Sequence, residues 1–286
     1  MASLKAIRKR ISSVKSTQQI TKAMKMVSAA KLRRAQDAAE QARPYTDKLS
    51  ALLRTVAAQM GPESHPLLAT REDERRVDLL LVTSDRGLCG AYNSNLIRRA
   101  ETFAREHPGA RVRLTLVGRK GYDYFRKRPV EIQEQHVNLF GGPDHPLAVR
   151  VRSRFARDFA AGEVDAVYLI YSHFRSALSQ VPTVQRLLPI SAAAQGEAEV
   201  VEYVYEPDPA TLLDRLLRQY VSALIDHAFL ESIASEHAAR MTAMDSATSN
   251  ASDMIDRLTL EMNRARQAAI TKELMEIVSG AEALKG

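Results

Sequence analysis

The residues best suited to chemistry lie in one turn, residues 83–93, between an apolar run and a helical pattern. Gly87 and Gly90 suggest a loop that cradles phosphate, and Cys89 carries a thiol that could act as a nucleophile. The spacing fits neither G-x-G-x-x-G nor the Walker pattern, because no Lys-Ser/Thr pair follows. A glycine turn that leads from a buried strand into a helix is the simpler interpretation.

Cys89 is the single cysteine of the chain, which excludes an internal disulfide and any multi-cysteine metal site. A lone cysteine in a reducing compartment acts more often as a small hydrophobic residue than as a nucleophile. As a nucleophile it would need a base from the scattered histidines, which are His107, His136, His145, His173, His227 and His237. With His65 included, no two histidines have metal-ligand spacing. The sequence predicts no catalytic centre, no metal and no cofactor.

The elements around this turn alternate between strand and helix patterns. Residues 77–83 form a nearly continuous apolar run, which is typical of a strand buried on both faces. Further strands are expected at 112–117 and 166–171, with edge strands near 180–188 and 200–205, and helices at 95–106, 120–128 and 146–161. This alternation predicts a central Rossmann-like α/β domain over residues 75–206, with a mainly parallel sheet.

Long helices are expected on both sides of this domain, over residues 1–60 and 208–286. In the first helix Leu4, Ile7, Ile11 and Val14 form an apolar stripe, Gln18 interrupts it, and the stripe is expected to resume at Ile20, Met24 and Val27. Pro44 would kink or break this helix. The second helix starts at Asp208-Pro209, a favourable N-cap followed by proline, and no further Pro or Gly occurs before Gly280.

The second helix carries a narrow seam that steps by three and four residues, typical of a coiled coil. The seam residues are Met241, Met244, Thr248, Ala251, Ile255, Leu258, Met262, Ala265 and Ala269. The helix would be about 105 Å long, whereas a compact chain of this size is about 50 Å across, so we expect it to project. We expect the two helices to pair antiparallel. Because the second helix is longer, its last turns should extend beyond the first helix as an apolar tip, which needs a collar from another protein. The tip residues are Ile270, Leu274, Ile277, Val278, Ala281 and Leu284.

The chain has 286 residues and a net charge of +7. Residues 1–36 contain ten Lys and Arg and no Asp or Glu, which indicates an anionic partner: nucleic acid, a membrane surface or an acidic protein. This segment has no aromatic residues for base stacking, which favours an acidic protein over nucleic acid. No run is long enough for a membrane span, and the start lacks the apolar region of a secretory signal. A nucleotide-using enzyme and a basic coiled-coil protein that binds nucleic acid are the alternative interpretations.

Several motifs resemble those of the gamma subunit family of F-type ATP synthases, and the resemblance covers the whole chain in order. They are ITKAMKMV at 20–27, SDRGLCG at 84–90, SEHAARM at 235–241, ARQA at 265–268 and ITKELMEIVSGA at 270–281. The resemblance implies a non-catalytic rotor shaft inside the ring of alternating alpha and beta subunits (alpha3beta3), attached to the epsilon subunit and the c-ring. Ion flow through the c-ring would turn the shaft, and the beta subunits would make ATP.

The resemblance also implies a location and a set of contact residues. We expect the cytoplasmic face of a bacterial inner membrane, because no presequence is visible, and no redox switch, because the family's plant form uses a cysteine pair. The acidic loops of the beta subunits would face Arg8, Lys9, Lys22, Lys25, Arg33 and Arg34. By motif match, the contact between rotor and stator would also include Met24, Arg240, Arg266, Gln267, Thr271 and Glu273.

Overall fold

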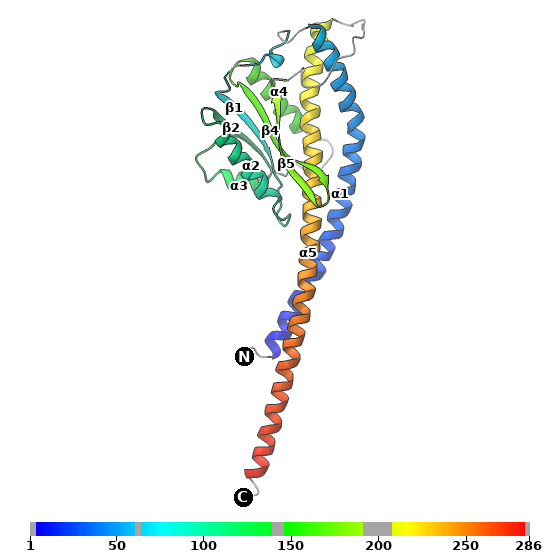
Figure 1. Ribbon diagram of the computed structural model, residues 1–286, viewed down its shortest axis with the longest axis vertical. Helices are drawn as coiled ribbons and strands as arrows, with labels where there is room; N and C mark the ends of the chain where they lie inside the picture. The colour runs from blue at the N-terminus through cyan, green and yellow to red at the C-terminus, as the bar shows by residue number, and fades with distance from the viewer. Residues whose placement is uncertain (1–3, 61–63, 72, 139–145, 191–207, 284–286) are drawn as a thin grey trace. The chain divides into compact units, whose positions relative to one another are not determined.

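The structure is a computed structural model that describes residues 4–60, 64–71, 73–138, 146–190 and 208–283. The chain divides into two compact units (Figure 1). Unit 1 consists of Met1–Ser28 and Met241–Gly286, and unit 2 consists of Ala29–Arg240. Helix α1 (Leu4–Met60) and helix α5 (Pro209–Ala283) each contribute to both units. None of the described helices is long and apolar enough to cross a bilayer.

Unit 2 contains a five-stranded sheet with the strand order β3-β2-β1-β4-β5. The strands are β1 (Arg76–Val82), β2 (Arg111–Val117), β3 (Glu131–His136), β4 (Ala166–Ser176) and β5 (Ser179–Leu188). All neighbouring strands are parallel except β4 and β5, which form an antiparallel pair at the edge. The mainly parallel sheet and the edge position of residues 180–188 are confirmed. Strand β3 was not predicted, because its sequence EIQEQH is polar and its side chains are only partly buried. The expected strand at 200–205 lies outside the described residues.

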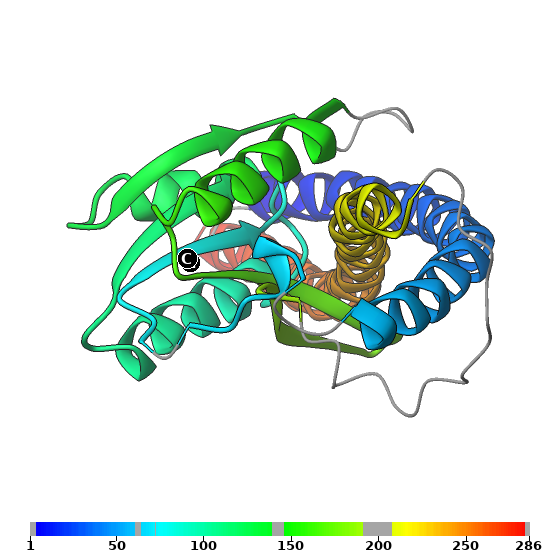
Figure 2. The ribbon, with the colours of Figure 1, turned by 90° about the horizontal axis from the view of Figure 1, so that it is seen from above.

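The two faces of the sheet are covered by different helices, as Figure 2 shows for α2 and α4. Leu79 and Leu81 of β1 face the core formed with α2 (Tyr92–Glu106) and α3 (Arg119–Phe125). Leu80 and Val82 face the core formed with α4 (Pro146–Ala160) and the unit 2 parts of α1 and α5. The continuous apolar run of β1 is explained, since its side chains are buried on both faces.

Helix α1 continues through Pro44, so of the two expected effects, a kink or a break, the break does not occur. Proline removes one backbone hydrogen bond, and burial of Leu49, Leu53 and Val56 in the unit 2 core stabilises the helix beyond it. Helix α5 begins as expected. Asp208 accepts a hydrogen bond from the Thr211 amide at 2.9 Å, and Pro209 follows as the first helical residue.

In unit 1 the two helices pair antiparallel. Thr21 Oγ1 lies 2.7 Å from Thr248 Oγ1, and Lys25 Nζ lies 2.6 Å from Asp245 Oδ1. The predicted seam of α5 is confirmed, because every seam residue from Met241 to Ala269 is buried or half-buried and most residues between them are exposed.

The predicted seam of α1 is wrong at two positions. Ile20 and Val27 are 60% and 56% exposed, whereas Gln18, Thr21 and Ser28 are buried or half-buried and take their place. The spacing of three and four residues continues from Val14 through these polar residues, and Ile20 and Val27 each lie one residue, about 100°, off that line. Helix geometry rather than residue type therefore decides which side chains face α5.

Candidate functional site

Two glycines that follow β2, Gly118 and Gly121, allow close backbone packing against Thr83, where the turn at 83–93 begins. Thr83 Oγ1 accepts a hydrogen bond from the Gly121 amide at 2.9 Å and donates one to the Val117 carbonyl at 2.9 Å. Gly118 has a φ of 91°, and a Cβ there would lie 2.1 Å from the Thr83 carbonyl oxygen. These contacts join the ends of β1 and β2, where a phosphate loop would need free amides.

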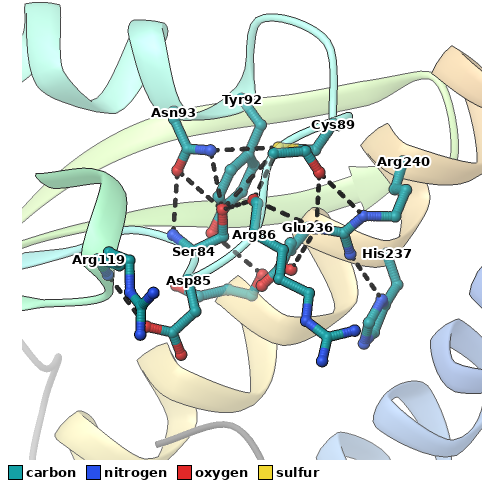
Figure 3. A network of polar contacts seen from close by, with 12 residues as sticks. Ser84, Asp85, Arg86, Cys89, Tyr92, Asn93, Arg119, Glu236, His237 and Arg240 are labelled. Atoms are coloured by element: carbon teal, nitrogen blue, oxygen red, sulfur yellow. Dashed lines mark hydrogen bonds and ion pairs between the residues drawn. The ribbon is translucent and has the colours of Figure 1, made fainter. Parts of the chain in front are cut away.

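The turn itself is held by a buried cluster of side chains (Figure 3). Asn93 Oδ1 accepts from the Ser84 amide at 3.0 Å, and Asn93 Nδ2 donates to Ser84 Oγ at 2.8 Å and to Cys89 Sγ at 3.2 Å. Cys89 is 2% exposed, and burial raises the pKa of its thiol. No histidine is among the hydrogen-bond partners of Cys89 in the described chain. A protonated, enclosed thiol without a base does not support nucleophilic catalysis.

Helix α5 covers the turn that follows the carboxyl end of β1. Arg240 Nη2 pairs with Glu236 Oε1 at 2.6 Å and donates to the Gly87 carbonyl at 3.3 Å and to the Arg86 carbonyl at 3.4 Å (Figure 3). Both members of this ion pair have side chains only 9% exposed. We call Ser84, Cys89, Asn93, Glu236 and Arg240 the polar joint.

Two further hydrogen bonds extend the contact of α5 toward β4. The Tyr92 hydroxyl donates to the Ser232 carbonyl at 3.1 Å, and Ser235 Oγ donates to the Ser172 carbonyl at 3.0 Å. In open α/β sheets, ligands bind beyond the carboxyl ends of the strands where the strand order reverses, which here is between β1 and β4. Side chains and carbonyls of α5 occupy that position.

The electrostatics of the polar joint are those of a closed structural contact. Burial raises the pKa of the Glu236 carboxyl, against the opposing effect of Arg240. Burial, together with the positive charges of Arg240 and Lys31, lowers the pKa of the neighbouring His237 to about 4. Among the described residues, no group of three His, Cys, Asp or Glu side chains could hold a metal ion.

The residues predicted to contact the stator have different environments. Most are exposed and lie on α1 or on the last third of α5: Arg8, Lys9, Lys22, Arg33, Arg34, Arg266, Gln267, Thr271 and Glu273. Met24 is half-buried, and Lys25 pairs with Asp245. Arg240 is 7% exposed and belongs to the polar joint.

An exposed apolar group beside Met24 was missed by the sequence reasoning. Ile20, Met26 and Val27 are each at least 56% exposed on α1. The signal was present in the sequence: extending the seam by threes and fours from Val14 would have placed Ile20 and Val27 on the outer surface.

Among the described residues of unit 1, no helix packs against the apolar tip of α5. All residues from Ile270 to Gly280 are exposed, and Ile270, Leu274, Ile277 and Val278 are each at least 50% exposed. Of the other predicted tip residues, the side chain of Ala281 and the whole of Leu284 lie outside the described residues. A helical surface this apolar is typical of a contact with another protein.

Comparisons with known proteins agree with these features. A family model described as ATP synthase matches residues 3–284. The chain is 53% identical to the ATP synthase gamma chain of Pelotomaculum thermopropionicum and 51% identical to that of Geobacter metallireducens, over the full length of each.

Solved structures show the same architecture. A chain of the Tetrahymena thermophila mitochondrial ATP synthase central stalk and c-ring is 30% identical, with a TM-score of 0.62 over 80% of this chain and 99% of that one. A chain of the Euglena gracilis mitochondrial ATP synthase has a TM-score of 0.70 over 98% of this chain and 94% of that one, at 20% identity. From the family match and the full-length relatives we conclude that the chain belongs to the ATP synthase gamma chain family.

Proposed function

We propose that this chain is the central rotor shaft of an F1Fo ATP synthase. Residues 1–60 and 208–286 form the shaft, and residues 75–206 form the part that joins it to the epsilon subunit and the c-ring. Proton flow through the c-ring at the cytoplasmic face of a bacterial inner membrane turns the shaft, and the turning shaft drives ATP synthesis on the beta subunits. The observation that carries this proposal is the unpaired apolar end of α5 in a full-length member of the gamma chain family.

The chain itself is not catalytic in this proposal. The polar joint supports this assignment, because α5 side chains occupy the carboxyl ends of the strands, where an enzyme of this architecture would bind its nucleotide. Cys89 is enclosed and protonated, so it offers no nucleophile. ATP binding by the isolated chain would argue for the alternative, a nucleotide-using enzyme.

The contact with the alpha and beta subunits has to hold the shaft and still let it turn. Exposed cations on α1, such as Arg8, Lys9 and Lys22, suit this task because surface ion pairs contribute only about 0–1 kcal/mol each and can break in turn. The exposed Ile20, Met26 and Val27 add a nearby apolar contact. The apolar tip would turn inside a nonpolar collar of the ring, where no fixed hydrogen bond opposes rotation.

Truncation of the tip tests the proposal. We expect a chain that ends at Ala269 to fold normally, because Ile270 to Gly280 are exposed, and to lose assembly with the ring or ATP-driven proton pumping. The matched control replaces the exposed Lys272 and Glu276 by Ala, which keeps the apolar surface and should preserve assembly. If the truncated chain assembles and pumps as many protons per ATP as the full chain, the tip has no role in the shaft.

A further inference from the structure

A group of buried polar and charged side chains lies between the sheet and α4. Asp78 of β1 and Thr115 of β2 are fully buried, and Arg154 of α4 is 7% exposed. Arg113 of β2 joins them with a side chain that is 17% exposed. Along β1 and β2 these positions alternate with residues of the core formed with α2, so their side chains point toward α4. We call Asp78, Arg113, Thr115 and Arg154 the α4 cluster.

Contacts within the protein satisfy only part of the α4 cluster. Arg113 Nε donates to Asp78 Oδ1 at 2.7 Å, and Arg154 Nη2 donates to Thr115 Oγ1 at 2.5 Å. Arg154 Nη1 lies 3.0 Å from Glu134 Oε1 without forming a hydrogen bond. In the described part of the chain, four buried atoms of the cluster therefore have no hydrogen-bond partner: the acceptor Asp78 Oδ2 and the donors Arg113 Nη2, Arg154 Nε and Arg154 Nη1.

Unsatisfied atoms of this kind are costly inside a protein. A buried donor or acceptor that lacks a partner has lost its hydrogen bond to solvent, and native structures almost always replace that bond. Burial accordingly raises the pKa of the Asp78 carboxyl, against the opposing effect of Arg113. Arg154 Nη2 lies 4.0 Å from Asp78 Oδ2, which is too long for a direct hydrogen bond but suits a bridging water.

The unsatisfied atoms select water rather than an ion as the ligand. Water can donate to the Asp78 carboxylate and accept from guanidinium groups at the same time. An anion would be repelled by Asp78 and by the neighbouring Asp158, whose side chain is 5% exposed. A cation would be repelled by the guanidinium groups of Arg113 and Arg154.

We propose that internal water is a structural ligand of the α4 cluster, where it bridges Asp78 Oδ2 to the guanidinium of Arg154 and satisfies the remaining donors. This water completes the attachment of one side of α4 to β1 and β2. Phe155 and Phe159 attach the other side of the helix through the apolar core. The site lies within unit 2 and does not depend on the proposed role of the chain as a shaft.

A high-resolution crystal structure of the full chain, grown in sodium bromide, tests the identity of the ligand. We expect water density about 2.8 Å from Asp78 Oδ2 and no anomalous bromide signal within the α4 cluster. Bromide at this position would show that the ligand is an anion. A direct hydrogen bond between Arg154 and Asp78 Oδ2, or the absence of any density between them, would show that no ligand is needed. Each of these three results would overturn the proposal.

Magnetic relaxation dispersion of the solvent tests the same site in solution, because it detects long-lived internal water. An apolar variant replaces the whole cluster by Asp78→Leu, Arg113→Leu, Thr115→Val and Arg154→Met. We expect this variant to lose part of the dispersion signal, since apolar surroundings do not hold water. The control Arg157→Met removes an arginine from the same helix whose side chain is 74% exposed, and should keep the full signal. Equal signals from the apolar variant and the unmodified chain would overturn the proposal.

Thermal unfolding shows whether the cluster acts as a unit. Asp78→Leu alone leaves the guanidinium groups of Arg113 and Arg154 buried without their carboxylate and should lower the thermal midpoint. The apolar variant should unfold at a higher temperature than Asp78→Leu, because apolar residues can replace a complete buried ion network at little cost. A midpoint of Asp78→Leu equal to that of the unmodified chain would contradict the bridging role given to Asp78.

Discussion

Replacing Arg240 by Met should open the turn after β1 without unfolding the protein. The substitution removes a buried guanidinium that pairs with Glu236 at 2.6 Å and holds two backbone carbonyls at 3.3 and 3.4 Å. Removing one partner of a buried ion pair costs roughly 3–5 kcal/mol. The two long carbonyl contacts add little, so we expect the lower end, about 3 kcal/mol.

Cys89 is a natural reporter of this opening. It is the only cysteine, it is 2% exposed, and it lies beneath the turn that Arg240 holds. Its labelling by a thiol reagent therefore requires the polar joint to open. When closing is fast, the labelling rate follows the opening equilibrium, and about 3 kcal/mol corresponds to a roughly hundredfold faster rate, since 1.4 kcal/mol is a factor of ten.

A double variant separates the ion pair from simple loss of packing. Because an apolar pair can replace a buried ion pair at little cost, Glu236→Leu/Arg240→Met should label within about tenfold of the unmodified chain. The far-ultraviolet circular dichroism of all three proteins should match, which excludes global unfolding. An unchanged rate in Arg240→Met, or equal rates in the single and double variants, would refute the reasoning.

Three further results are expected. Burial and nearby positive charges lower the pKa of His237 to about 4, from its ordinary value near 6.5, so the free energy of unfolding should fall by about 3 kcal/mol as the pH drops from about 6.5 to about 4. His237→Gln should flatten this dependence in urea titrations. Burial acts to raise the pKa of Asp165, but hydrogen bonds from Arg76 and Arg71 lower it to about 2. The ionised Asp165 carboxylate therefore stabilises the fold above pH 4, and this stabilisation is lost toward pH 2. Asp165→Asn should lower the free energy of unfolding by about 2 kcal/mol at pH 7, and the urea unfolding curves of the variant and the unmodified chain should converge near pH 2. In unit 1, Thr21→Val alone should lower the thermal midpoint by leaving the Thr248 hydroxyl without its cross-helix partner, whereas Thr21→Val/Thr248→Val should be nearly neutral; a double variant less stable than the single would contradict this.

Periodicity and burial made much of the fold predictable. The run at β1 is apolar on both faces because both faces are covered, and the seam of α5 keeps its spacing from Met241 to Ala269. Where burial and residue type disagree, the prediction failed. Thr21 and Ser28 are buried although they are polar, and β3 is polar because it lies at an edge of the sheet.

The candidate site was less predictable, because it depends on contacts between distant parts of the chain. Glu236 and Arg240 show an i, i+4 spacing that usually means an exposed ion pair on a helix. Only the packing of α5 against the turn at Gly87 buries that pair.

Rotation of the chain inside its ring is the most direct test of the proposed function. Leu178, at the tip of the β4–β5 hairpin, is 84% exposed and provides an attachment point as Leu178→Cys in a Cys89→Ser background. With the complex immobilised through the ring and a fluorescent rod on this cysteine, we expect ATP to drive continuous rotation in one direction. A rod that stays fixed while the same complexes hydrolyse ATP would contradict the assignment of this chain as the shaft.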